Sequence, residues 1–357
     1  MEFIENFEIF QIVNFLGLLI GLIFGIIAQK NQFCFSGSIK DYLLTNSTRR
    51  SASVVTAIIT AIISTYLLAL YFEIDLSQSV YYKDNINYFS LIFGAILFGS
   101  GMIFADGCSS RHLVKFAQGD PYSLITLLFI GIFAFATTQG ILYEPISFFS
   151  QNEYLIELSS MVNIQSVNIY VIVLLLALAL RQVTKKPSRV FELYDGVIIG
   201  LLVAFGWYVT SILGSESIER FIPLESLAFV YPTGNTIEFF TQYNSTELTF
   251  SISVIIGVLS GAFFMSRLNK KYSFGCTSNL QRSKIKYNMI GGAMMGTGGV
   301  LAIGCTVGQG LSGLSTLAFS SLVAIVFILG SGYITATFLA KKDQLPMCFI
   351  FEWKDEK

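Results

Sequence analysis

The chain has 357 residues, of which 54% are hydrophobic and only 13% are charged, and its net charge is −1. Soluble globular proteins carry about 25% charged residues, so this composition excludes an ordinary soluble domain and indicates a polytopic membrane protein. The near-neutral charge and the lack of a basic run give no support to nucleic-acid binding, and the single histidine, His112, excludes a multi-histidine metal site.

Apolar segments follow one another along the chain and predict an all-α protein with about nine transmembrane helices. The N-terminus is acidic and lacks the basic start of a secretory signal, so we expect the first apolar segment to be a permanent span. The spans are expected at about 10–29, 51–72, a third ending near Asp106, 121–142, 168–183, 193–213, 249–266, an eighth that holds residues 296–305, and 317–340.

The loops between these spans alternate between basic and acidic composition. Because positively charged loops stay in the cytoplasm, the alternation predicts an N-terminus outside the cell and a cytoplasmic C-terminus. We further expect short re-entrant helices around Cys34 and Cys276. The basic loops are 30–50, 181–192, 267–287 and the tail, and the acidic ones are the N-terminus, 73–88, 143–168 and 214–248.

One short motif occurs twice, as GSGMIFADGC at 99–108 and as GTGGVLAIGC at 296–305. Both copies read G-x-G, five residues, then Gly-Cys. By the predicted topology the first repeat helix runs inward and the second outward. We therefore expect one membrane domain, 1–357, built from two inverted pseudo-symmetric halves at about 10–142 and 193–340, as in many transporters.

The glycine before each repeated cysteine, Gly107 or Gly304, predicts a sharp bend where the helix breaks. A helix that starts anew after the break presents free N–H groups, and these bind anions readily. Each cysteine adds a weak S–H donor and a polarisable sulfur. The candidate polar groups beside Cys108 and Cys305 are Ser109, Ser110, Thr306 and Gln309.

An anion that suits such a site has oxygen atoms for the N–H groups and a soft atom for the thiols. Thiosulfate meets both requirements, whereas sulfate meets only the first. Arg111 and Lys115 are the cations nearest to Cys108 in the sequence, and we expect them to draw the anion toward one mouth. The spans show no embedded pair of Arg or Lys residues, so we expect weak and rapid handling of the anion.

A cysteine in a membrane helix is often only a small packing residue. The repeat places Cys108 and Cys305 in the same local pattern, which favours a functional role for both. Cys34 stands between two phenylalanines in a polar segment that can form a short helix from Ser36. Cys276 follows a glycine and stays an open candidate for the path, and Cys348, in the tail, is interpreted as incidental.

The segments NQFCFSGSIKD, GSGMIFADGC and GTGGVLAIGC, with GQGLSGLS after the last, resemble the YeeE/YedE family of sulfur and thiosulfate transporters. The resemblance implies nine spans and several short helices in the bacterial inner membrane. It maps the family's essential cysteines onto Cys34, Cys108 and Cys305, which in that family are thought to pass thiosulfate through a narrow waist by transient S–H contacts. It also implies a cytosolic sulfurtransferase partner of the TusA type.

Two other functions stay open at this point. The chain could be a membrane thiol protein that moves sulfane sulfur, electrons or a selenium compound, although it has no C-x-x-C pair. A transporter of soft metals would need Met and His near the cysteines, and the repeats lack that cluster. We therefore expect a transporter rather than an enzyme, without a cofactor.

Overall fold

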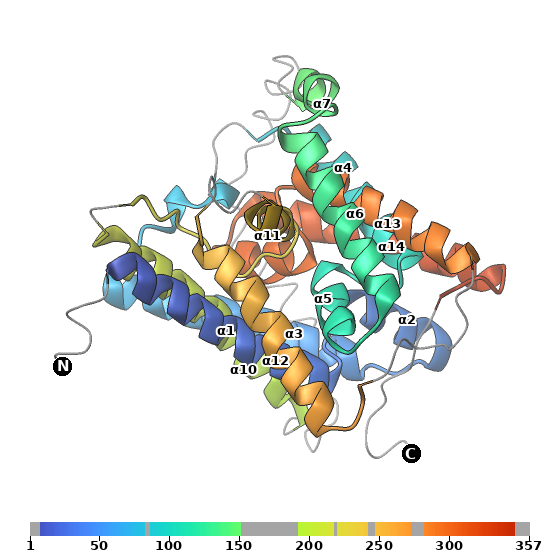
Figure 1. Ribbon diagram of the computed structural model, residues 1–357, viewed down its shortest axis with the longest axis horizontal. Helices are drawn as coiled ribbons and strands as arrows, with labels where there is room; N and C mark the ends of the chain where they lie inside the picture. Colours follow the sequence, from blue (N-terminus) through green and yellow to red (C-terminus); the bar gives the residue numbers. More distant parts are fainter. Residues whose placement is uncertain are drawn as a thin grey trace.

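The computed structural model describes residues 8–82, 86–150, 192–217, 220–241, 247–272 and 282–346. Within these ranges the regular structure is entirely helical (Figure 1). Seven helical segments are long and apolar enough to cross a membrane, so the chain is a multi-pass membrane protein. They are Ile9–Thr45, Arg49–Phe72, Tyr88–Ala117, Pro121–Thr138, Tyr194–Leu213, Phe250–Leu268 and Phe319–Lys341.

The helices fall into a long and a short class. The long ones are α1 (Ile9–Asn31), α3 (Arg49–Phe72), α4 (Tyr88–Phe104), α6 (Pro121–Thr138), α10 (Tyr194–Tyr208), α12 (Phe250–Leu268), α13 (Arg282–Leu301) and α14 (Phe319–Lys341). The short ones are α2 (Phe35–Thr45), α5 (Ser109–Ala117), α7 (Tyr143–Ser150), α11 (Tyr231–Thr241), the 3-10 turns η1 (Leu76–Gln78) and η2 (Val80–Tyr82), and the π-helical turns η4 (Val209–Leu213) and η5 (Gly308–Gly313).

Seven of the predicted spans coincide with the seven apolar segments. The span predicted at 168–183 lies outside the described residues. The eighth is helical as α13, but it is not among the apolar segments, because the basic residues at its start and its many glycines lower its hydropathy. The number of nine spans therefore stays a prediction.

The long helices form two groups that the short helices join. Contacts link α4, α6, α13 and α14 in one group, and α1 with α12 and α3 with α10 in the other, as Figure 1 shows. Helix α5 contacts α6 and α12, and helix α2 contacts α3 and α14. The starts of these short helices, which carry the cysteines, therefore lie where the two groups meet.

Glycines bring the paired helices into backbone contact. A Cβ placed on Gly21 of α1 would lie 2.1 Å from the carbonyl oxygen of Val254 in α12, and one on Gly257 would lie 2.2 Å from that of Leu18. Gly200 packs α10 against α3 in the same way. Only glycine allows such an approach, because any Cβ would overlap the neighbouring backbone.

The two repeated motifs lie in α4 and α13, which pack against each other in opposite directions. Gly101 lies near the end of α4 and faces Gly291 in the middle of α13. A Cβ on Gly101 would lie 2.8 Å from the Gly291 carbonyl oxygen. Gly94, earlier in α4, faces Leu301 at the end of α13. The helices that carry the repeats therefore pack against each other at the centre of the first helix group.

The two glycines of each G-x-G sequence face different neighbours, because residues two apart lie on different faces of a helix. A Cβ on Gly99 would lie 2.2 Å from the carbonyl oxygen of Ile328 in α14, whereas Gly101 faces α13. In the second copy Gly296 faces α6 and Gly298 faces α4. Each repeat helix is thus fixed between two others.

We expect Gly99→Ala to lower the free energy of unfolding by about 1–3 kcal/mol, since a methyl group must displace the backbone of α14. The matched control is Gly330→Ala in α14, where a Cβ would meet nothing within 4 Å. Thermal unfolding of the protein in detergent checks the difference. Equal melting temperatures for the two variants would contradict the backbone contact.

Candidate functional site

Helices α4 and α13 end in the same way, directly before their cysteines. Asp106 and Ile303 adopt left-handed backbone conformations, with φ of 60° and 55°. The glycines that follow, Gly107 and Gly304, each donate their N–H to the carbonyl oxygen five residues earlier, at 2.9 and 2.8 Å. This is a Schellman-type helix end, so the sharp bend predicted at both positions is confirmed.

Each of the three described cysteines precedes a short helix. The Sγ of Cys34 accepts the N–H of Gly37 at 3.3 Å, and the Sγ of Cys305 accepts the N–H of Gly308 at the same distance. Cys108 is the N-cap residue of α5, and its sulfur lies 3.3 Å from Ser110 Oγ. The sulfurs therefore stand at helix N-termini, where N–H groups and the helix dipole favour an anion.

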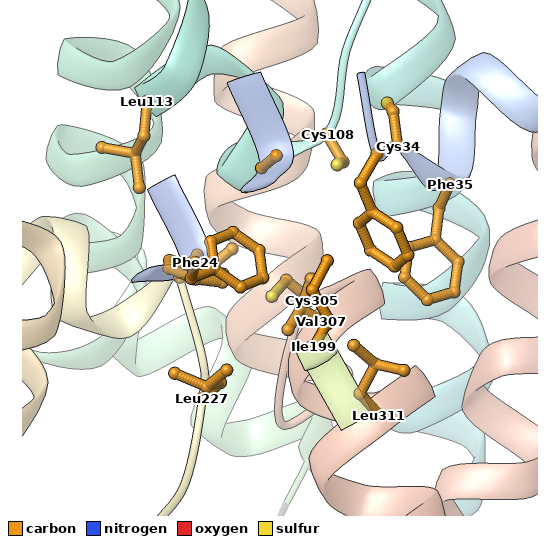
Figure 2. Packing of buried hydrophobic residues seen from close by; sticks show 14 of the residues in the cluster. Phe24, Cys34, Phe35, Cys108, Leu113, Ile199, Leu227, Cys305, Val307 and Leu311 are labelled. Carbon is orange, nitrogen blue, oxygen red and sulfur yellow. The ribbon is translucent and has the colours of Figure 1, made fainter. Parts of the chain in front are cut away.

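The three thiols belong to one buried cluster. Figure 2 shows Cys34 and Cys108 above Cys305, with Phe24 and Phe35 on opposite sides of Cys305 in this view. Cys34 and Cys108 are direct neighbours. All three are reduced, and none is more than 3% exposed. The structure thus brings together the cysteines on which the family resemblance rests.

Buried hydroxyl groups lie beside the sulfurs of Cys34 and Cys108. Within the described part of the chain, the fully buried hydroxyl of Ser109 has no hydrogen-bond partner, and the fully buried hydroxyl of Thr306 faces the Cys108 sulfur. Gln309 donates one of its two amide N–H groups to the Ala302 carbonyl at 2.5 Å. A buried polar group without a partner is costly, which makes the Ser109 hydroxyl a candidate for contact with a ligand.

Several cations lie inside the protein, so the expected lack of an embedded Arg or Lys pair is wrong. Lys40 and Lys115 both bind the Asp106 carboxylate, at 2.7 and 2.9 Å, and each is at most 5% exposed. Arg111 is also buried and donates to Gln32 Oε1. The sequence hides this cluster because its members come from segments 66 residues apart that meet only in the fold.

The positions of Arg111 and Lys115 differ from the expected open mouth. Both lie on α5, whose residues are nearly all buried, and Arg111 faces Cys34. The Lys115 ammonium group donates to both the carbonyl oxygen and the carboxylate of Asp106, which follows the end of α4. Their role in drawing an anion stays a prediction, and of the two only Arg111 is placed beside a thiol here.

Tyr81 is a residue of this region that sequence reasoning missed. The segment 73–88 was expected to be a polar loop, yet Tyr81 in η2 is only 6% exposed. Its hydroxyl oxygen lies 3.4 Å, and the Cys305 sulfur 3.8 Å, from the point that a Cβ on Gly308 would occupy. The available signal was the run of Val80, Tyr81 and Tyr82 within an otherwise polar loop.

The other cysteines, Cys276 and Cys348, lie outside the described residues. Among the described residues, no three His, Cys, Asp or Glu side chains are grouped so that they could hold a metal ion. The site therefore consists of thiols, hydroxyls, backbone N–H groups and nearby cations.

The chain is similar to known transport proteins over most of its length. A family model described as "Sulphur transport" matches residues 30–334. The chain is 26% identical over 336 residues to "Thiosulfate transporter TsuA" of Spirochaeta thermophila, a match that covers 88% of this chain and 96% of that protein. It is 21% identical over 350 residues to "Thiosulfate transporter TsuA" of Escherichia coli, covering 90% and 93% of the two chains.

Glu225 gives a pH prediction. Burial raises the pKa of its carboxyl group from 4.5 to about 7, against a weaker opposing hydrogen bond from Ser251. A carboxyl group with a raised pKa in the folded state favours that state less as it ionises, so stability falls as pH rises from about 4.5 to about 7. Glu225→Gln removes this loss.

We expect the melting temperature in detergent to fall more between pH 5 and pH 8 in the wild type than in Glu225→Gln. The control is Glu73→Gln, which changes an exposed carboxyl group and is expected to keep the wild-type profile. Identical pH profiles for wild type and Glu225→Gln would show that this carboxyl group is not desolvated.

Proposed function

The chain belongs to the sulphur transport family, and from this premise we propose that it carries thiosulfate across the bacterial inner membrane into the cytoplasm. Two relatives that it matches over almost their whole length are named thiosulfate transporters. The observation that carries the proposal is the buried cluster of Cys34, Cys108 and Cys305, each at the start of a short helix.

The chemistry of this cluster suits thiosulfate better than sulfate. Backbone N–H groups and the buried hydroxyls of Ser109 and Thr306 can donate to the oxygens of either anion. The thiols add soft, weakly donating S–H groups that match a terminal sulfur. Transient S–H hydrogen bonds then move the anion from one cysteine to the next, and no covalent bond forms or breaks.

The charges around the cysteines suggest a direction. Cys305 lies beside Tyr81, in the acidic segment that the topology places outside the cell. Cys34 and Cys108 lie beside Arg111, on the side of Lys40 and the basic segment 30–50. We infer that the anion meets Cys305 first and leaves past the cations, with the N-terminus outside and the C-terminus in the cytoplasm.

Helix directions support two inverted halves, at about 10–142 and 193–340. In the first group α4 runs parallel to α14 and α13 runs parallel to α6, while α4 and α13 are antiparallel. In the second group α1 is parallel to α12 and α3 is parallel to α10. An exchange of α1 with α10, α3 with α12, α4 with α13 and α6 with α14 preserves every one of these pairings.

The cation cluster sets the strength of binding in this proposal. Lys40 and Lys115 are both neutralised in part by Asp106, which leaves an attractive but shared charge. A dianion is drawn toward them without a dedicated pair of free cations to hold it. Such a site favours passage over tight capture, and a cytosolic sulfurtransferase of the TusA type is the proposed acceptor of the released thiosulfate.

One observation favours the second candidate function, thiol chemistry. Cys34 and Cys108 are neighbours, and neighbouring thiols can cycle through a disulfide. In that case serine at either position would abolish function completely. A hydrogen-bonding role would survive Cys→Ser in part, because serine also donates a hydrogen bond.

Uptake of sulfur-labelled thiosulfate by cells that lack other carriers tests the function, with sulfate and selenite as competitors. We expect excess unlabelled thiosulfate to block the uptake and sulfate to leave it nearly unchanged. Absence of uptake with the protein present in the membrane would refute thiosulfate transport. Strong competition by selenite would favour a selenium compound as substrate.

We expect Cys108→Ala and Cys305→Ala each to reduce thiosulfate uptake to background, because each removes one thiol from the path. The matched control is Cys348→Ala, which changes the cysteine of the tail and is expected to leave uptake unchanged. Membrane levels of each variant are measured in parallel. Wild-type uptake by both Cys108→Ala and Cys305→Ala would refute the proposed path along the cysteines.

A further inference from the structure

His112, the one histidine of the chain, is a buried side chain that the proposed thiosulfate path does not use. It lies on α5, one helical turn after Cys108, to whose carbonyl oxygen its backbone N–H donates at 3.0 Å. Only 1% of its surface is exposed. The apolar segment Tyr88–Ala117 contains it, and an ionisable side chain at such a place is costly to bury, which points to a function that involves its charge.

Hydrogen bonds fix the orientation of the ring and the position of its proton. Ser123 Oγ donates to Asp120 Oδ2 at 2.8 Å, so the hydrogen of that hydroxyl is already in use. His112 Nδ1 lies 3.1 Å from the same Oγ and is therefore the donor of this second bond. The neutral ring then carries its proton on Nδ1, and Nε2 presents a lone pair.

The lone pair of Nε2 has no use in the packing of the protein. Within the described part of the chain, Nε2 is a buried atom without a hydrogen-bond partner. It lies beside the bend that precedes Cys108, at 3.2 Å from the place that a Cβ on Gly107 would occupy. The bond to Ser123 explains a side chain with one donor at this position, but not a second ring nitrogen. A basic nitrogen without a partner is a place where a proton can bind.

The empty site disfavours a positive charge on the His112 ring. The charged groups that face the ring or its hydrogen-bonded partner Ser123 are Lys115, Asp106, Arg111, Lys40 and Asp120. Three cations thus stand against two carboxylates in a place that is removed from water. A further positive charge there is unfavourable, so the ring is neutral while the site is empty.

The helices that pack against α5 add no other charge near the ring. Helix α6 carries no charged residue between Pro121 and Thr138. Helices α1 and α12 each carry one, Lys30 and Arg267. Lys30 lies 5.7 Å from the ring centroid of Tyr194, and Arg267 lies 3.9 Å from that of Tyr272. The charge balance at His112 is therefore set by the cluster around Asp106.

Arrival of a dianion reverses this balance. Thiosulfate that passes Cys108 and Arg111 brings two negative charges to the cluster, and a nearby negative charge favours the protonated ring. Once protonated, Nε2 becomes a donor, and the anion supplies an acceptor. By thermodynamic linkage, an anion that favours the proton is itself bound more tightly when the proton is present.

We propose that His112 Nε2 binds a proton together with thiosulfate, so that the protein moves the anion and a proton in the same direction. The inference rests on the proposed function and adds a coupling ion to it. The proton comes from water on the side where the anion enters and returns to water when the anion leaves. The Nδ1 proton stays in its bond to Ser123, and no bond to sulfur forms or breaks. Ser123 and Asp120 are positioning residues that hold the ring in this tautomer.

Proton uptake on thiosulfate binding tests the inference without transport. Thiosulfate is added to the protein in weakly buffered detergent solution at about pH 7, where histidine changes its charge, and an indicator dye follows the pH. We expect the wild type to take up protons as it binds the anion. His112→Asn, whose amide N–H replaces the Nδ1 donor, is expected to bind thiosulfate without proton uptake. Equal proton uptake by both proteins, or none by a wild type that binds thiosulfate, would overturn the proposal.

Uptake into proteoliposomes tests the coupling itself, with the membrane potential held constant. We expect an acidic exterior to raise the initial rate of thiosulfate uptake by the wild type about fivefold over equal pH on both sides, and a protonophore to abolish the increase. The rate of His112→Asn is expected to be independent of the proton gradient. A wild type that ignores the gradient, or a variant that keeps the full increase, would contradict the proton site.

Two variants of α6 control for the loss of a buried hydroxyl. Thr126→Val removes a hydroxyl that donates to the Tyr122 carbonyl oxygen, and we expect it to respond to the gradient as the wild type does. Ser123→Ala removes the partner of Nδ1 and is expected to respond less, since the tautomer is no longer fixed. If His112→Asn does not fold, Ser123→Ala decides, and a full wild-type response with unchanged proton uptake by Ser123→Ala would refute the proposal.

Failure of the coupling can be told apart from failure of the transport function. If the wild type takes up no thiosulfate at any pH, the proposed function itself fails. If the wild type takes up thiosulfate at a rate that the proton gradient does not change, only the proton site at His112 is refuted.

Discussion

Inside a membrane protein every backbone N–H and C=O must find a partner within the protein, and this constraint shapes the whole site. Helices that stop in the interior leave such groups unpaired. Here α4 and α13 end in the same way. A left-handed residue is followed by a glycine whose N–H donates to the helix carbonyl oxygen five residues earlier. The chain then starts a new short helix, and the sulfurs of Cys34 and Cys305 accept N–H groups at two such starts.

The same groups therefore serve the fold and the chemistry. A cysteine that caps a helix already stands where backbone N–H groups gather, so a site for a soft anion needs little beyond the cap itself. The buried cations Lys40 and Lys115 are tied to Asp106, the left-handed residue that ends α4. Charge, helix end and thiol thus form one structural unit, and none of them can be moved without the others.

The helix ends and bends next to the cysteines could be predicted from the sequence, but the residues that pack around them from other segments could not. Gly107 and Gly304 predicted the bends because glycine tolerates unusual backbone angles, although a left-handed non-glycine residue precedes each of them. The apolar segments predicted most long helices. Tyr81 and Lys40 escaped because their importance comes from segments that meet only after folding. Polar composition suggested a solvated loop for Tyr81, and packing against Trp207 outweighed it.

The close glycine contacts between paired helices also limit how these helices can move. Where a Cβ would lie 2.1 Å from a neighbouring carbonyl oxygen, as at Gly21, two backbones interlock, and one helix cannot slide past the other without first lifting away. Each close-packed helix pair therefore moves as one rigid unit. The inexpensive motions are rotations of single side chains, such as the phenylalanines around Cys305 in Figure 2, which reorient far faster than domains do. Local rearrangements of side chains beside the cysteines therefore do not require the helices of a close-packed pair to separate.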